Sequence, residues 1–550
     1  MKIKINFRWL PVLMMGFLFM ASGQAQSLET KIDKLLQSQY KSREPGATAL
    51  VAKNGKVLYR KAFGNANLEL NIPMKPENVF EIGSITKQFT AVGILMLMEQ
   101  GKVSPDDEIT RFLPDYPTHG KKITVHHLLN HTSGIKSYTA MGNLNDLARK
   151  DMTPKELIDY FKNEPMDFDP GEAYRYNNSG FIILGYIIEQ LSGKTYEEFI
   201  EKNIFKPLGM TSSYYGSHTR IIKNRASGYQ QRDGFANAAY LSMTLPYAAG
   251  SLMSNVDDLL KWQQAIHNNT LIKAETIKKA FTNYTLNNGN PINYGYGWSI
   301  NEINGAPSIE HGGGIFGYTT MGVYVPEENV YVAVLTNCDC SSPGDVATKI
   351  AALAIGKPFP EMGNAYTLSE KQMKKWTGAY EFEDGAVRFI TLENGQLYSQ
   401  RENSTKFKIF PASRDRFYFE SGLIEYQFSK KKRKKEVIFK SRINTSKGVE
   451  TNKKPPAEKE TISIDATILK QYVGNYEVQP GFSIEITTQG NKIFAQATGQ
   501  PKFEIYAEDP SKFFLKVVDA RIEFSKNSNG EVTGLTLFQG GQEVKGKKTG

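Results

Sequence analysis

The sequence predicts a mixed α/β domain, with a central antiparallel sheet and a helical region, followed by two small all-β barrel domains. Strand patterns flank a helical middle in the first 360 residues, and aromatic and β-branched residues then recur in short alternating runs. The chain has 550 residues, enough for about three or four domains, and is 40% hydrophobic and 23% charged. This composition supports packed cores and excludes a mainly disordered, collagen-like or coiled-coil chain.

The N-terminus has the three parts of a secretory signal peptide. Basic residues through Arg8 precede an apolar stretch at 9–20, and small residues follow up to Ala25. The apolar stretch is shorter than the ~20 residues that span a bilayer, which argues against an uncleaved membrane anchor. We therefore predict a signal peptide over 1–25 and a secreted or periplasmic bacterial protein with no integral membrane segment after cleavage.

Much of the net charge of +10 is local. Part lies in the predicted signal peptide, and part is the run of six Lys and Arg residues at 430–435. This run contains no aromatic residues for base stacking, so it predicts a solvated hairpin tip and no nucleic-acid partner. Cys338 and Cys340, the two cysteines, are too few for a disulfide framework or a thiolate metal site.

Strands are predicted near both ends of the first domain, which we place at 26–360. Asn54 and Gly55 can take the positive φ values of a two-residue turn, so they join a first hairpin. Alternating apolar residues around short loops indicate two later hairpins. The predicted strands are 47–52, 57–59, 296–303, 308–311, 318–325 and 330–336. We expect the two ends of this domain to close one sheet.

Two buried helices are predicted between these strands. Residues 88–99 and 181–191 are apolar almost all round, which is typical of a buried helix rather than a surface helix. Gly193 is expected to end the second of them. We expect helices to cover the sheet.

After about residue 360 the sequence repeats itself at an offset of 96 positions. Trp376 and Tyr380 align with Tyr472 and Tyr476. The other aligned pairs include Leu397 with Ile493, Gln400 with Gln496, Phe407 with Phe503, Ile409 with Ile505, Phe417 with Phe513 and Phe428 with Phe524. Such a repeat predicts a duplicated β domain. We place the copies at 361–450 and 461–550 and the polar linker at 451–460.

Four Ser-x-x-Lys sequences occur, and one of them has the context of a catalytic site. Ser84 stands at the mouth of the apolar helix, and the three-residue spacing puts its hydroxyl and the Lys87 amine on one face. Backbone N–H groups there can stabilise an oxyanion, and a partly desolvated lysine can act as a base. The alternative is that Ser84 only caps the helix and that Lys87 is solvated.

A second motif is Tyr176-Asn177-Asn178, in a polar segment just before the second buried helix. A tyrosine beside Lys87 would have its phenolate favoured by the ammonium, which makes it a plausible proton carrier. The Asn178 amide could hold a substrate carbonyl. The alternative is an ordinary Asn-rich turn.

The third motif is His311-Gly312-Gly313-Gly314, ahead of the strand that begins at Tyr318. Glycines let a substrate backbone approach closely, and the Gly314 N–H could be a second oxyanion donor. The alternative is a flexible loop that carries an incidental histidine.

Taken in order, these motifs resemble those of the serine β-lactamase and penicillin-binding protein superfamily, in its class C-like branch. Supporting stretches lie at 128–134, 207–210, 249–254, 257–259 and 294–298, and the resemblance covers about residues 28–357. It implies a β-lactamase-like fold for the first domain. A catalytic domain followed by two small β-barrels also looks like the architecture of D-aminopeptidases in this family, and a lipocalin-like domain follows it in other peptidase members.

The resemblance also implies roles for the motif residues. Ser84 would be the acylated nucleophile, Lys87 its activating base and Tyr176 the proton shuttle to the leaving group. The N–H groups of Ser84 and Gly314 would form the oxyanion hole. Further contacts to the substrate would come from Asn178, His311 and Gly313. Whether lysine, tyrosine or both take the serine proton is left open.

One departure from the family pattern bears on the substrate. Class C β-lactamases carry Lys-Thr-Gly where this chain has His311-Gly312-Gly313, so a permanently charged carboxylate clamp is replaced by a group that is often neutral at pH 7. The same exchange appears in D-Ala-D-Ala carboxypeptidases, D-aminopeptidases and esterases. The resemblance therefore implies a secreted serine hydrolase without cofactor or metal, a peptidase or esterase on D-amino-acid-containing peptides.

Several alternatives stay open. The protein could instead be a class C-type β-lactamase, or a non-turnover penicillin-binding sensor. A zinc hydrolase is suggested by His126, His127 and His131, which include an i, i+4 pair on an expected helix, but no glutamate stands between them as in His-Glu-x-x-His. A surface-adhesion role for the β repeats rests only on the basic run. The oligomeric state and the role of the repeats are not predicted.

Overall fold

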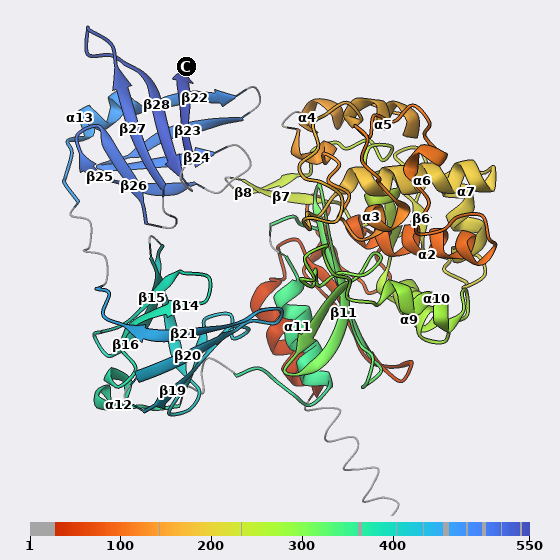
Figure 1. Cartoon of the computed structure of the whole chain (residues 1–550), viewed down its shortest axis with the longest axis horizontal. Helices are drawn as coiled ribbons and strands as arrows, with labels where there is room; N and C mark the ends of the chain where they lie inside the picture. The colour runs from red at the N-terminus through yellow and green to blue at the C-terminus, as the bar shows by residue number, and fades with distance from the viewer. Residues whose placement is uncertain are drawn as a thin grey trace, which may run out of the picture. The chain divides into compact units, whose positions relative to one another are not determined.

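The structure is a computed structural model of the chain, and it describes residues 28–141, 144–232, 234–340, 342–360, 366–402, 404–432, 434–454, 461–479, 482–497, 502–516, 518, 520–539 and 542–549. These residues form two units, one ending at Phe359 and one beginning at Pro360, and each is described by itself (Figure 1). The predicted signal peptide and most of the predicted linker lie outside the described residues. Among the described helices, none is long and apolar enough to cross a membrane.

A six-stranded antiparallel sheet forms the centre of the first unit, in the order β10-β11-β12-β13-β1-β2. Its strands are β1 (Ala47–Lys53), β2 (Lys56–Phe63), β10 (Ser299–Ile303), β11 (Ala306–Ile315), β12 (Tyr318–Val325) and β13 (Val330–Thr336). Because β1 pairs with β13, the two ends of the domain close one sheet, as predicted. The turn between β1 and β2 has positive φ at Asn54 and Gly55, also as predicted.

Helices cover both faces of this sheet. Side chains alternate along β13, so that Val332 and Val334 pack against the helix at 28–39 and α11 (Gly344–Ala354). Ala333 and Leu335 point to the opposite face and join the large core of the helical region. Helix α9 (Val256–His267) lies against β13 and β1. Figure 1 shows α11 at the sheet and the helical region on the other side of the sheet.

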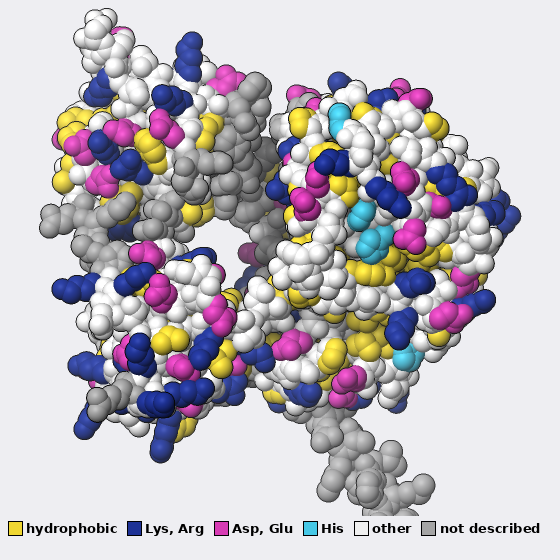
Figure 2. Space-filling view, in the orientation of Figure 1, with side chains coloured by type: hydrophobic (Ala, Val, Ile, Leu, Met, Phe, Trp, Pro, Cys, Tyr) yellow, Lys and Arg dark blue, Asp and Glu magenta, His cyan; other side chains and the backbone are white. Residues whose placement is uncertain are grey.

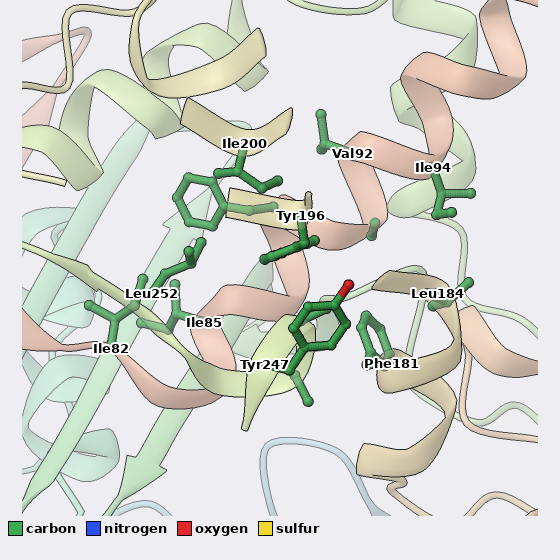
Figure 3. Packing of buried hydrophobic residues seen from close by; sticks show 14 of the residues in the cluster. Ile82, Ile85, Val92, Ile94, Phe181, Leu184, Tyr196, Ile200, Tyr247 and Leu252 are labelled. Carbon is green, nitrogen blue, oxygen red and sulfur yellow. The ribbon is translucent and has the colours of Figure 1, made fainter. Parts of the chain in front are cut away.

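The two predicted buried helices are α2 (Thr86–Glu99) and α6 (Asn178–Ser192), and they pack against each other. Side chains from both helices meet in one core, including Val92 and Leu184 (Figure 3). Gly193, at φ 65°, ends α6 as predicted. Because α2 is buried almost all round, its first turn has no access to bulk water.

Shorter elements connect these helices and strands. The helical ones are η1 (Gly83–Ile85), η2 (Ile109–Arg111), α3 (Val125–Leu129), η3 (Tyr138–Ala140), α4 (Leu144–Leu147), α5 (Pro154–Phe161), α7 (Tyr196–Ile200), η4 (Glu201–Phe205), α8 (Tyr247–Gly250) and α10 (Ala274–Ala280). The strands are β3 (Asn65–Asn67), β4 (Ile72–Pro73), β5 (Phe80–Glu81), β6 (Tyr214–Tyr215), β7 (Tyr229–Arg232), β8 (Gly234–Asn237) and β9 (Leu252–Ser254). β5, β9 and β6 form a small separate sheet.

The second unit contains two closed eight-stranded antiparallel barrels, which confirms the predicted fold class. After α12 (Glu370–Lys374), the first barrel comprises β14 (Gly378–Phe382), β15 (Val387–Glu393), β16 (Gln396–Arg401), β17 (Lys406–Pro411), β18 (Arg416–Phe419), β19 (Glu425–Lys431), β20 (Lys434–Lys440) and β21 (Thr445–Thr451). After α13 (Ala466–Leu469) and η6 (Lys470–Tyr472), the second comprises β22 (Gly474–Gln479), β23 (Phe482–Gln489), β24 (Lys492–Ala497), β25 (Phe503–Asp509), β26 (Lys512–Leu515), β27 (Ala520–Lys526), β28 (Val532–Gln539) and β29 (Gln542–Lys548).

Equivalent hydrogen bonds recur in the two barrels at the predicted offset. The Tyr380 hydroxyl donates to the Trp376 carbonyl at 2.7 Å, and the Tyr476 hydroxyl donates to the Tyr472 carbonyl at 2.8 Å. The Trp376 indole and the Tyr472 hydroxyl each donate in turn to a later carbonyl at 2.8 Å. The repeat in the sequence is therefore a repeat of one internal framework.

The basic run forms the tip of the hairpin between β19 and β20. Lys430 pairs with Lys435 across the hairpin, and Lys432 has the positive φ of a turn residue. Arg433 lies outside the described residues. The Lys435 amine forms an ion pair with Glu450 at 2.8 Å. This agrees with the predicted hairpin tip. On the face in view in Figure 2, acidic and basic side chains are interspersed on both units.

Replacing Tyr380 or Tyr476 by Phe would test the duplicated framework. Each change removes one buried hydrogen bond and keeps the ring, so we expect the free energy of unfolding of the affected barrel to fall by about 1–2 kcal/mol. Denaturant unfolding of the full chain measures this. Tyr366, which is exposed, offers a control in Tyr366→Phe. A loss in only one of the two barrels would contradict their equivalence.

Candidate active site

Ser84 lies in the 3₁₀ turn η1, which leads directly into α2. The turn is held from both sides through Ile82. The Ile82 N–H donates to the Leu252 carbonyl at 2.9 Å, and the Ile82 carbonyl accepts from the Thr320 hydroxyl at 2.9 Å. The Ile82 and Leu252 side chains also pack in the core (Figure 3). The position of Ser84 is therefore set by strand pairing and packing rather than by a loop.

Strand β11 approaches this turn so closely that only glycine fits at two positions. A Cβ on Gly313 would lie 2.0 Å from the Ile82 carbonyl oxygen and 2.3 Å from the Thr320 hydroxyl. A Cβ on Gly83, which has a φ of 51°, would lie 2.9 Å from the Gly314 nitrogen. Gly314 itself faces open space. The glycine run is thus part of a strand, and not the flexible loop of the alternative interpretation.

Lys87 is fully buried, and its amine meets three oxygens. Nζ lies 3.1 Å from Ser84 Oγ, 2.8 Å from Asn178 Oδ1 and 2.8 Å from the Ala249 carbonyl. Burial lowers the pKa of Lys87 well below its usual value. A neutral amine has two N–H groups and one lone pair. Because the amide and carbonyl oxygens can only accept, they take the two N–H groups, and the lone pair faces the Ser84 hydroxyl.

Tyr176 stands immediately before α6, beside both residues. The Lys87 Nζ lies 4.8 Å from the centre of the Tyr176 ring. Burial raises the pKa of Tyr176, and a hydrogen bond with Ser84 offsets part of that rise. Since 37% of the residue is exposed, solvent moderates the effect of burial. The phenol is therefore protonated at neutral pH, which differs from the phenolate that an ammonium at Lys87 would favour.

Asn178 is the first residue of α6, and its amide is fixed at both ends. Oδ1 accepts from Lys87, and Nδ2 donates to the Thr139 hydroxyl at 3.0 Å. An amide nitrogen carries two N–H groups, and the bond to Thr139 uses one of them. Asn177 caps the helix by accepting from the Gly180 N–H at 2.8 Å, which fixes the entry of the chain into α6.

His311 lies on β11 with both ring nitrogens engaged. Nε2 is 2.8 Å from the Tyr294 hydroxyl, and Nδ1 is 2.6 Å from the Gly312 carbonyl. Because a carbonyl can only accept, Nδ1 carries the proton and Nε2 accepts from the tyrosine. Burial, together with the nearby Lys87, lowers the pKa of His311 to about 3. The imidazole is therefore neutral at pH 7.

His131 packs against the site, and sequence reasoning gave it no catalytic position. Its ring centre is 4.4 Å from that of Tyr176, and its Nδ1 accepts from the Asn177 N–H at 3.1 Å. Helix α3 ends at Leu129, so the predicted helical pair of His127 and His131 is wrong. His127 instead caps α3. Within the described parts of the chain, no group of His, Cys, Asp or Glu could hold a metal ion.

A cavity of about 330 Å³ opens in front of Ser84. Its described lining includes Asn178 and Gly314 and is otherwise mostly apolar, with Tyr138, Leu144, Leu241, Leu245, Pro246, Ile315 and Phe316. Asp339 is the only charged side chain among these described lining residues. It stands between Cys338 and Cys340, which form a disulfide that the sequence analysis did not predict.

Comparison with known protein families identifies the family of the first domain. Residues 28–357, more than half of it, match the family described as Beta-lactamase. The chain belongs to the Beta-lactamase family. Residues 458–548 match a Domain of unknown function (DUF3471). The predicted resemblance of the first domain is confirmed.

Several individual proteins and solved structures are also similar to this chain. Penicillin-binding protein 4* of Bacillus subtilis is 29% identical over 434 residues, 74% of this chain and 94% of that protein. The D-aminopeptidase of Gluconobacter oxydans is 28% identical over 323 residues, and the chain spans 60% of its length. The solved structure of an octameric penicillin-binding protein homologue from Pyrococcus abyssi is 30% identical, with a TM-score of 0.55 over 77% of this chain and 99% of that one. D-amino acid amidase from Ochrobactrum anthropi shares the fold, at a TM-score of 0.54 and 23% identity over 61% of this chain and 99% of that one.

In this member of the Beta-lactamase family, Gly313→Ala should separate β11 from the turn that carries Ser84. The added Cβ would meet the Ile82 carbonyl at 2.0 Å, so we expect a loss of about 1–3 kcal/mol in the free energy of unfolding. Gly314→Ala is the matched control, because its Cβ would meet no atom within 4 Å. Denaturant unfolding compares the two variants. Equal stability of the two variants would contradict the close approach.

The stability of the first unit should also depend on His311 at low pH. Its pKa of about 3 is depressed from 6.5, so the unfolded chain binds one more proton between these values. Stability from this group is complete above pH 6.5 and is lost as pH falls, by up to about 1.4 kcal/mol per pH unit. His311→Gln should therefore flatten the decline in unfolding free energy, measured by urea unfolding from about pH 7 down to about pH 4. Parallel curves would contradict this.

Proposed function

We propose that the protein is a secreted serine hydrolase that works through an acyl-enzyme on Ser84, as a peptidase or esterase on D-amino-acid-containing peptides of the D-aminopeptidase or DD-carboxypeptidase type. The observation that carries the proposal is the contact of Ser84 Oγ with the Nζ of a fully buried lysine at 3.1 Å. The N-terminal signal pattern supports secretion.

Acylation begins at this contact. Ser84 Oγ forms a bond to the carbonyl carbon of the substrate while its proton passes to the lone pair of Lys87 Nζ. The carbonyl oxygen becomes an oxyanion, for which the N–H groups of Ser84 and Gly314 are the proposed donors. Lys87 is the preferred base over Tyr176, because burial favours a neutral amine and a protonated phenol.

The leaving group departs with a proton from Tyr176. Collapse of the tetrahedral intermediate breaks the bond to the amine or alcohol, which takes up the phenolic proton, and the Lys87 ammonium returns a proton to the tyrosine. Water then attacks the acyl-serine ester with the same groups acting in reverse. The products are the free acid and the amine or alcohol, and Ser84 and Lys87 regain their starting protonation.

The substrate class is supported by the neutral imidazole of His311, which cannot act as a permanently charged carboxylate clamp. Similarity to a D-aminopeptidase agrees with a peptide or amide substrate. A β-lactamase or a non-turnover penicillin-binding protein is the second candidate. It is favoured by the match to Penicillin-binding protein 4*, which extends over 94% of that protein.

A fluorescent fluorophosphonate tests the nucleophile. We expect the wild-type protein to be labelled and Ser84→Ala to remain unlabelled. Ser38→Ala is the matched control, since Ser38 belongs to another Ser-x-x-Lys sequence but is exposed, and its hydroxyl donates to the Leu35 carbonyl. Labelling that persists in Ser84→Ala would reject the assignment.

Turnover of four substrates then separates the candidate functions: a p-nitrophenyl ester, nitrocefin, a D-alanine anilide and an acyl-D-Ala-D-Ala peptide. Turnover of nitrocefin alone would favour the β-lactamase, and one acylation event without deacylation would favour the sensor. For the best substrate, Tyr176→Phe should lower kcat by about 10²–10⁴-fold. Lys87→Arg should be inactive, because a guanidinium cannot accept the serine proton.

A further inference from the structure

The cavity in front of Ser84 has an unusual distribution of charge. Its described lining is mostly apolar, and Asp339 supplies the only charged side chain among those residues. The loop that carries Asp339 follows β13 and reaches the cavity next to the end of β11. Gly317, whose N–H binds Asp339, follows Gly314 by three residues, a chain span of at most about 11 Å. The carboxylate and the proposed oxyanion donor, Gly314, therefore line the same cavity.

Asp339 is held in place by neutral groups. Its Oδ2 accepts from the Gly317 N–H at 3.0 Å and from the Gln230 amide at 2.9 Å. Its own N–H donates to the Tyr229 carbonyl at 3.1 Å. Within the part of the chain that the structure describes, Oδ1 has no hydrogen-bond partner, and no Lys or Arg forms an ion pair with Asp339. The carboxylate is thus fixed in orientation while its charge stays uncompensated.

No fixed positive charge balances Asp339 elsewhere in the described site. Both nitrogens of His311 are engaged by Tyr294 and Gly312, and burial keeps the ring neutral. The Lys87 amine is enclosed by Asn178 and Ala249 and faces Ser84 rather than the cavity wall. A substrate that carries a carboxylate here would meet repulsion from Asp339 and no cation in return. A substrate with an ammonium group would be attracted by Asp339 and would meet no fixed cation that repels it.

We propose that Asp339 determines specificity by binding the free ammonium group of the substrate, so that the enzyme prefers amides, esters or short peptides that carry a free amino group. The apolar lining would accommodate a side chain of the substrate. This inference rests on the proposed function of Ser84, and it narrows that function to an aminopeptidase or amidase rather than a carboxypeptidase or β-lactamase.

The test is a series of three D-alanine p-nitroanilides that differ in charge: the free amine, the N-acetyl derivative and the N-succinyl derivative. At about pH 7 the free amine is mostly protonated, the acetyl derivative is neutral and the succinyl derivative is negative. We expect wild-type kcat/KM to fall in that order. Asp339→Asn keeps an acceptor for the Gly317 N–H and removes the charge. It should lower the ratio of free-amine to acetylated turnover by about tenfold, mainly through KM, and raise the relative turnover of the succinyl derivative.

Ionic strength separates a charge effect from a structural one. Salt should reduce the wild-type preference for the free amine and leave the ratio of Asp339→Asn unchanged, because screening acts only where the carboxylate is present. Asp115→Asn, which removes an exposed charge of the same unit, should keep the wild-type ratio. If Asp339→Asn changes turnover of all three anilides by one factor, the inference is wrong while labelling of Ser84 still supports the proposed function. If Ser84 is not labelled in the wild-type protein, the proposed function fails instead.

Discussion

The burial of one amine determines how the first unit is arranged. An ammonium group without solvent is costly, so burial favours the neutral amine of Lys87, which needs acceptors for its two N–H groups. Asn178 at the start of α6 and the Ala249 carbonyl of α8 supply them. The hydrogen bonds of Lys87 Nζ therefore bring three helices, α2, α6 and α8, together at this amine. The apolar core around them excludes the water that would otherwise solvate it.

The same burial sets the protonation of the neighbouring groups. His311 loses its proton affinity mainly through its own burial, and its hydrogen bonds to Gly312 and Tyr294 then select one tautomer. Burial also disfavours the phenolate of Tyr176, so the tyrosine retains its proton. The site therefore has an acceptor amine, a donor phenol and a neutral imidazole at neutral pH. In the proposed mechanism, a positive charge arises when Lys87 takes the proton of Ser84, at the moment when a negative oxyanion forms nearby and compensates it.

Sequence patterns predicted most of the fold because its decisive signals are local. Asn54-Gly55 marks a hairpin turn, the all-round apolar segment after Ser84 marks a buried helix, and the offset of 96 positions marks two copies of one barrel. The spacing of Ser84 and Lys87 also predicted their proximity, since three residues correspond to about one turn of a helix. The turn, the helix and the serine–lysine pair depend on neighbours in the chain, and the repeat is visible when the sequence is compared with itself.

What could not be predicted depends on contacts between distant segments. His131 was expected on a helix with His127, but α3 ends at Leu129 and the ring packs on Tyr176 instead. Asp339 has no sequence neighbour that indicates a site, and only the antiparallel pairing of β11, β12 and β13 brings it to the cavity. The stretches around His131 and Tyr294 resembled the family, yet no pattern indicated which of their side chains pack near Ser84.

The barrels show which features of a repeat are constrained. Trp376 and Tyr472 differ in chemistry, but each presents a donor that reaches a carbonyl at 2.8 Å, and each packs against the equivalent phenylalanine. The two copies therefore share a buried hydrogen-bond donor at this position, although the side chain that supplies it differs. The basic hairpin tip at 430–435 has no counterpart at the same offset, where the chain reads Lys-Asn-Ser-Asn-Gly-Glu. Since the core of a barrel needs a fixed set of hydrogen bonds and its exposed turns do not, any difference in role between the two copies must lie in their outer surfaces and loops.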